Sequence, residues 1–507
     1  MTLTQAFDDL FVRFRCHFKR PETFERARAF AFSYLLSYGR RTISRLICTR
    51  NVHHRDWSAD YKFFSRAVWN PDDLFYELFQ AALPYSEWPA GHIVCTMDAS
   101  LGKKTGRTIP GVSTLRDPMS LPFHTNLVRG LRYIEVSILV GPAEQLQYHR
   151  AIPIWFKHSP PAKKPKKNAS DEDKARYRQA QKAQNLNTQG RQAVFELQEY
   201  LHRQKGGKKL TLVLTVDGSF CNRRFLKDLP SDVVIVARAR KDMKLFAPLT
   251  PSGGHGKGRR RLYGERLPTP EAMRRDDQTY PWKTMRVYAA GKYHDLRYKC
   301  VGPVLWQKGT RSQRMRLLII APLRYRKSKQ SKLLYRRPAY LLAAEGDIPD
   351  ENLIQYYFLH WDIEVNHRDE KSLLGLYEAQ VRSEKSVERC PQFSALVYGV
   401  LLLAALRAYG PERTDHYLPL PKWRKPTQRR PSTLDILAQF RREILIAQLK
   451  EDPIPNQPLN PKRKRQQKRP RSNIEAKKRG FVKKTKQQRS TLKLPVNILS
   501  ALLYAYG

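Results

Sequence analysis

Apolar side chains recur at helical spacing through residues 1–90. The pattern is clear in FERARAFAFSYLLSYGRRTISRLI and again in PDDLFYELFQAAL, where apolar residues return every three or four positions. Between these stretches, DWSADYKFFSRAVW alternates aromatic and basic residues, which suits a DNA-contacting surface and equally a packed aromatic core. We therefore predict a helical N-terminal domain over residues 1–90 that binds DNA.

From residue 91 the pattern changes to that of β-strands. The runs HIVCTMDAS, YIEVSILVGP and YHRAIPIWF follow one another closely. After a Lys/Pro-rich linker and a polar helical stretch come KKLTLVLTVDGSF and DVVIVARAR, which are separated by the short helix NRRFLKDL. The order β-β-β-α-β-α-β predicts an α/β core whose first part covers residues 91–244.

The second half of the chain divides by composition. Residues 245–340 are rich in Gly, Pro and Arg with short alternating runs, which predicts a β-rich insertion domain. Residues 341–415 contain one long helical segment from about residue 350 to 374 and an apolar helix over residues 393–409, which we assign to the second part of the core. Residues 416–507 form a basic C-terminal region, whose Lys/Arg/Pro/Gln-rich stretch from about residue 420 to 493 is expected to stay mobile until it meets DNA.

A large positive charge narrows the choice of partners. Lys and Arg number 94 against 46 Asp and Glu, which gives a formal net charge of +48. Such a chain favours a polyanion, because each neutralised phosphate releases a counterion. Nucleic acid is the partner that this charge indicates, with ribosome association or a basic solvated surface as the alternatives.

Cysteine usage and apolar runs indicate the compartment. The six cysteines are scattered without C-x-x-C pairs, which argues against disulfides and structural zinc. The N-terminus carries acids where a signal peptide needs an apolar core. The run that begins at Phe393 is short for a membrane span and contains Arg407, so a buried helix is expected. We predict no membrane partner and a cytoplasmic, nucleoid-associated location.

Two aspartates end apolar strands of the predicted core. Asp98 closes HIVCTMD, and Asp217 follows KKLTLVLTV. Either one alone is as readily a turn former as a ligand. If the first and fourth strands lie side by side, however, both carboxylates project from one sheet edge, and such oxygen ligands suit Mg²⁺ or Mn²⁺.

A third acid lies in the helical segment YYFLHWDIEVNHRDEKSLLG. At about 100° per residue, Tyr357, His360, Glu364 and Lys371 fall within one arc of about 60°. An aromatic, an acid and two titratable groups on one face suit a metal and phosphate site; an amphipathic helix with solvated charges is the alternative. Glu370, the nearest competing acid, lies on a different face.

This spacing resembles the Y-(2)-R-(3)-E-(6)-K signature of DDE transposases from bacterial insertion sequences, here in a W-x-I-E context at Trp361–Glu364. The resemblance extends to Asp98 in MDASLGKKTGR, to Asp217 in VDGSF and to the long insert, and so covers residues 91–409. It implies an α/β fold with a ribonuclease-H-like mixed sheet and flanking helices, interrupted by the β-rich insertion. His360 stands where the signature has Arg, which leaves its contact with phosphate open.

The resemblance also implies a mechanism. Asp98, Asp217 and Glu364 would be the catalytic residues and the ligands of two Mg²⁺ ions, with Mn²⁺ as a possible substitute, about 4 Å apart. Asp98 would bridge both ions. Water would free the transposon 3′ end, which then attacks target DNA. The expected DNA contacts are Tyr357, His360, Lys371, Lys103, Lys104 and Arg107.

The implied partner is double-stranded DNA, as transposon ends and target, bound by a homodimer. Trp282 or Trp306 would stack on a flipped base or serve as a core aromatic. Two rival functions stay open: an inactive or domesticated relative that only binds DNA, and a ribonuclease-H-like repair nuclease. The presence of all three acids favours an active transposase.

Overall fold

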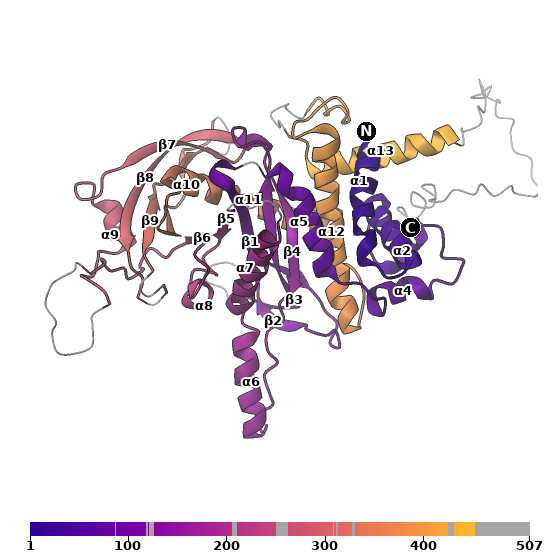
Figure 1. Cartoon of the computed structure of the whole chain (residues 1–507), viewed down its shortest axis with the longest axis horizontal. Helices are drawn as coiled ribbons and strands as arrows, with labels where there is room; N and C mark the ends of the chain where they lie inside the picture. The colour runs from indigo at the N-terminus through magenta and orange to yellow at the C-terminus, as the bar shows by residue number, and fades with distance from the viewer. Residues whose placement is uncertain are drawn as a thin grey trace, which may run out of the picture.

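The computed structural model describes residues 1–86, 88–117, 120, 126–204, 210–249, 262–307, 309–310, 313–326, 330–423 and 430–451. At its centre lies a long mixed sheet (Figure 1). The strands of its first half are β1 (His92–Lys103), β2 (Ser113–Arg116), β3 (Leu127–Val140), β4 (Arg150–His158), β5 (Thr211–Val216) and β6 (Val233–Arg238). The predicted strand order is confirmed, with β2 as an additional short strand.

Strand pairing in this half is antiparallel on one side of β1 and parallel on the other. β3 pairs antiparallel with β1 and with β4, while β1, β5 and β6 run parallel to one another. β5 is almost entirely buried, as expected for a parallel strand covered on both faces. This arrangement confirms the predicted mixed α/β core.

The segment predicted to be β-rich continues the same sheet. Its long strands are β7 (Lys283–Ala289), β8 (Lys292–Val304), β9 (Met315–Ile320) and β12 (Ala339–Ala344). β12 pairs antiparallel with β6, so these strands extend the core sheet to ten strands instead of forming a separate one. The apolar sequence of β12 explains this position, since five of its six residues are buried. A two-stranded ladder of β10 (Arg324–Tyr325) and β11 (Leu334–Tyr335) and the helix α9 (Pro270–Arg275) complete the segment.

The N-terminal region is helical, as predicted. Its helices are α1 (Leu3–Val12), α2 (Pro21–Leu36), α3 (Ile43–Thr49), α4 (Ser58–Ser65) and α5 (Pro71–Ala82). The aromatic residues Phe63, Phe64 and Trp69 of the DWSADYKFFSRAVW stretch are buried, whereas Trp57 and Tyr61 are exposed. Core packing therefore accounts for part of the aromatic pattern that sequence alone could not assign.

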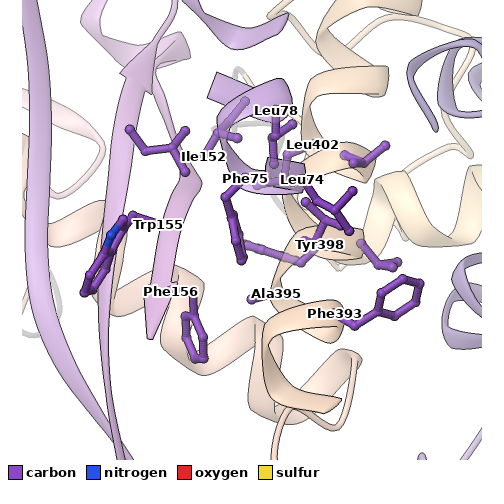
Figure 2. Packing of buried hydrophobic residues seen from close by; sticks show 14 of the residues in the cluster. Leu74, Phe75, Leu78, Ile152, Trp155, Phe156, Phe393, Ala395, Tyr398 and Leu402 are labelled. Carbon is purple, nitrogen blue, oxygen red and sulfur yellow. The ribbon is translucent and has the colours of Figure 1, made fainter. Parts of the chain in front are cut away.

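The helix α12 (Glu384–Tyr409) joins this region to the sheet. Figure 2 shows Phe393, Tyr398 and Leu402 of α12 with residues of α5 and of β4 in one apolar cluster. Among the described helices, α12 is long and apolar enough to cross a membrane, but 89% of its apolar window is buried inside the protein. The expected buried helix is therefore found, and it begins nine residues earlier than Phe393 because the polar first turns also pack.

Other helices cover the sheet and the termini. They are α6 (Asp171–Ala183), α7 (Leu186–His202), α8 (Arg223–Leu226), α10 (Asp350–Leu359), α11 (Trp361–Leu373) and α13 (Thr433–Glu451), with 3₁₀ turns at Arg13–His17, Leu83–Tyr85, Pro89–Gly91 and Leu146–Tyr148. None of the residues of α6 is buried, and the helix projects from the body in Figure 1.

Two predictions about the C-terminal half are wrong. The single helix expected from residue 350 to 374 is two helices, α10 and α11, that meet at His360, whose side chain is tied to strands of the sheet. The basic C-terminal region contains an ordered helix, α13, because Ile436, Leu437 and Phe440 pack into the core beside α1 and α2. Of the segment expected to be mobile, residues 424–429 and 452–493 lie outside the described residues.

Candidate active site

The first two acids lie on adjacent strands. β1 and β5 pair in parallel as far as Met97 and Val216, so Asp98 and Asp217 are the next residues on each chain. The prediction that Asp98 ends its strand is wrong, because β3 continues to pair with β1 as far as Lys103. Asp98 instead lies where β1 loses β5 as a neighbour, which opens that side of its carboxylate.

Asp217 also has a local structural role. Its Oδ1 accepts hydrogen bonds from the backbone N–H of Ser219 at 2.9 Å and from the Ser219 hydroxyl at 2.6 Å. The turn-forming interpretation of this strand-end aspartate therefore holds. The negative charge of Asp217 also acts on Asp98, because it is one of the causes that raise the pKa of Asp98.

The helix α11 brings the third acid to Asp98. Candidate ligand atoms of Asp98, Glu364 and His367 all lie within 4.8 Å of one another. Glu364 is exposed, Asp98 is half-buried and His367 is buried. His367 was not predicted from the sequence as a metal ligand. The sequence carries a signal for it, because the i, i+3 spacing of Glu364 and His367 places two ligands on one helix face.

Burial and the neighbouring charges change the pKa of the Asp98 carboxyl. The pKa of Asp98 is raised to about 7, mainly by burial and also by the charges of Asp217 and Glu364, while His367 opposes the rise. The negative charges of Asp217 and Glu364 disfavour ionisation of Asp98, and a divalent cation beside these carboxylates offsets that repulsion. The oxygen donors of Asp98 and Glu364 and the imidazole of His367 therefore fit a divalent metal ion.

A buried polar cluster lies behind this site. Glu135 is directly opposite Asp98 in the β1–β3 register and is 0% exposed. Its Oε2 lies 3.1 Å from His367 Nε2, while Ser137 and Asn366 donate to its Oε1 at 2.7 and 3.2 Å. Burial opposes ionisation of Glu135, but His367 holds the pKa of Glu135 below its usual value.

Glu370 completes the cluster as a fully buried acid. The residue is 0% exposed, and burial, followed by the charge of Glu135, raises its pKa well above the usual range. Burial therefore favours the neutral form of Glu370. Glu370 lies on a different helix face from Glu364, as predicted, and that face is directed to the interior.

His360 and Tyr357 are engaged within the fold. Thr96 of β1 and Thr215 of β5 lie within hydrogen-bond distance of His360 Nδ1, the latter at 3.2 Å. The rings of Tyr357 and His360 stack with centroids 5.9 Å apart. Burial lowers the pKa of His360 to about 4, so its ring is uncharged at neutral pH and offers a phosphate no positive charge.

The basic residues selected from the sequence occupy different environments. Lys371 is exposed on α11, and Asp98 and Glu364 are among the acids that oppose the lowering of its pKa by burial. Lys103 is ion-paired to Asp117 at 2.8 Å. Lys104 donates to the carbonyl oxygens of Tyr377 and Ala379 at 2.6 and 2.9 Å, and Arg107 is exposed.

Trp282 and Trp306 both contact other side chains of the protein. The Trp282 indole N–H donates to Asp277 at 2.8 Å, and the Lys299 ammonium lies 4.5 Å from its ring centre. Trp306 is partly buried against the apolar cluster of the extended sheet. Both rings therefore have structural roles.

A basic recess runs between α11 and the β7–β8 hairpin. Its volume is about 780 Å³, and its lining includes Trp361, Tyr293, Arg286 and Lys292. Trp361 is 66% exposed, and the Arg286 guanidinium lies 4.9 Å from the Tyr293 ring centre. The acids of the lining are neutralised locally, since Asp362 pairs with Arg430, and Asp369 with Arg368.

The fold and the acid cluster agree with a family match. A family model described as DDE superfamily endonuclease matches residues 13–312. The chain belongs to this family. The matched span includes Asp98 and Asp217 and ends before Glu364. No curated protein matches the chain significantly.

Membership of the DDE superfamily gives the site its general chemistry. It implies a metal-dependent nuclease whose substrate is DNA, and it is consistent with the resemblance to DDE transposases. The mixed sheet with flanking helices agrees with the ribonuclease-H-like fold of such an enzyme. The divalent metal of a DDE endonuclease matches the donor set of Asp98, Glu364 and His367.

Proposed function

We propose that this DDE endonuclease is a transposase of an insertion sequence, of the branch with the Y-R-E-K signature. It would bind transposon ends, cleave them and join the 3′ ends to target DNA. The observation that carries the proposal is that Glu364 of α11 meets Asp98 of β1, with candidate ligand atoms within 4.8 Å of one another. Asp217 is not part of that group; it follows the adjacent parallel strand β5 and acts on Asp98 through its charge. Lys371, seven residues beyond Glu364, lies on the same helix face.

In this proposal each side chain has a defined task. Asp98, Asp217 and Glu364 hold divalent metal, Mg²⁺ or alternatively Mn²⁺. When bound, such ions activate the attacking oxygen and stabilise the leaving one. Lys371 attracts the phosphate beside the acids, and the tied ring of His360 fixes the start of α11 against β1 and β5.

Charge supports DNA as the bound partner. The net charge of +48 favours phosphate contact along the whole chain, and the recess beside α11 offers exposed Arg286 and Lys292 next to the acids' helix. We propose that the enzyme acts as a homodimer across paired ends and works on cytoplasmic, nucleoid-associated DNA.

An excision assay on the DNA that flanks the gene tests the function. The variants Asp98→Ala, Asp217→Ala and Glu364→Ala should each lower excision by at least about 100-fold, because each removes a charge that the transition state requires. Asp171→Ala is the matched control, since its side chain is 99% exposed on α6. A wild-type protein that binds these ends without cutting them would support the DNA-binding-only alternative, and activity in all three variants would refute the proposal.

A further inference from the structure

The His367 imidazole has one nitrogen against a buried carboxylate and one directed to Asp98. Nε2 lies 3.1 Å from Glu135 Oε2, and Nδ1 lies 3.9 Å from Asp98 Oδ2. The second separation is too long for a hydrogen bond. It accommodates a metal ion, because ions of this class bind nitrogen and oxygen ligands at about 2 Å each.

The partner of Nε2 is itself fixed. Glu135 is fully buried and held through its other oxygen by Ser137 and Asn366, and Tyr398 donates to the Asn366 carbonyl oxygen at 3.0 Å. A carboxylate behind one imidazole nitrogen keeps the proton there and turns the other nitrogen toward the metal. Histidine ligands of metal sites are typically oriented in this way.

We propose that His367 binds the metal through Nδ1, together with Asp98 and Glu364, and that Glu135 is the positioning residue that orients it. This inference rests on the proposed metal-dependent cleavage and adds a nitrogen ligand to the three acids. Mg²⁺ takes oxygen ligands, whereas first-row transition ions accept imidazole. The site should therefore bind Mn²⁺ more tightly than Mg²⁺.

Electron spin-echo spectroscopy of the full-length protein, loaded with Mn²⁺ alone, tests directly whether His367 is a metal ligand. Nitrogen-14 modulation of the Mn²⁺ signal is expected in the wild type and should be lost in His367→Gln. His202→Gln is the matched control, because the His202 side chain is 64% exposed and should leave the modulation unchanged. Bound Mn²⁺ without nitrogen coupling in the wild type, or a wild type that binds no Mn²⁺ at all, would overturn the inference without any variant.

Calorimetric titration with Mn²⁺ tests the role of Glu135. Glu135→Gln keeps the shape of the side chain and removes its charge, so Mn²⁺ affinity should fall by about 10- to 100-fold. Circular dichroism of the same sample establishes that the variant is folded, and unchanged affinity in a folded variant would refute the positioning role. If excision still depends on the three acids while no nitrogen coupling is seen, the ligand assignment fails and the proposed function stands.

Discussion

At the scale of single residues, the partners of a buried acid decide whether it keeps its charge. Glu370 is fully enclosed, and burial raises its pKa well above the usual range. Glu135 is equally enclosed but stays ionised, because His367, Ser137 and Asn366 supply compensating contacts. Burial without a partner neutralises a carboxyl, and burial with several donors preserves its charge.

His360 should make stability depend on pH. Its pKa is lowered to about 4 in the folded protein from 6.5 in the unfolded chain, so the unfolded state binds the extra proton as pH falls. The stabilisation is complete above pH 6.5 and is lost progressively down to about pH 4. Urea unfolding should show that His360→Asn loses less stability than the wild type between pH 7 and pH 4.5, by up to about 3 kcal/mol. Parallel pH profiles for the two proteins would contradict this expectation.

At the scale of elements, the local pattern of apolar residues was sufficient to predict those strands and helices whose boundaries depend on their own sequence. The apolar run of β5 predicted both the strand and Asp217 at its end. The cluster of Glu135 and His367 could not be predicted, because it depends on the β1–β3 register and on the rotation of α11 against the sheet. The break at His360 and the pairing of β12 with β6 depend likewise on contacts between distant segments.

The helix α13 illustrates how tertiary contacts override composition. Its carboxylate Glu443 accepts hydrogen bonds from the N–H groups of Leu3 and Thr4 at the start of α1, at 3.2 and 2.8 Å. Those N–H groups at a helix N-terminus otherwise lack partners within the helix. Charge alone predicted a mobile segment, but the apolar face of α13 and this cap hold it on the body.

Truncation of Phe440 should measure this docking. The side chain is 0% exposed, and its ring packs edge-on against Phe7 with centroids 5.3 Å apart. Phe440→Ala should lower the free energy of unfolding by about 3 to 5 kcal/mol in urea titration. Leu445→Ala on the same helix is the control, because Leu445 is 42% exposed and should change stability by less than about 1 kcal/mol. Equal losses in both variants would indicate that α13 is not docked through this face.

At the scale of the whole molecule, the chain has 94 basic and 46 acidic residues. We expect DNA to be bound by those basic side chains that are not paired with an acid. Arg286 in the recess beside α11 is exposed and stacks on Tyr293, whereas Arg240 is paired to Asp242 at 2.9 Å. If DNA follows the recess, Arg286→Gln should reduce the slope of log affinity against log salt by about 1, as expected for one lost phosphate contact.

Fluorescence anisotropy with a labelled duplex, measured over a series of salt concentrations, gives this slope directly. Arg240→Gln should leave it unchanged, because the Arg240 charge is already balanced by Asp242 in the free protein. The comparison shows whether DNA binds along the recess or is attracted by the positive charge of the whole protein. If only the overall charge mattered, the loss of either arginine would change the salt dependence equally. Equal slopes for the two variants would therefore place the bound duplex away from the recess.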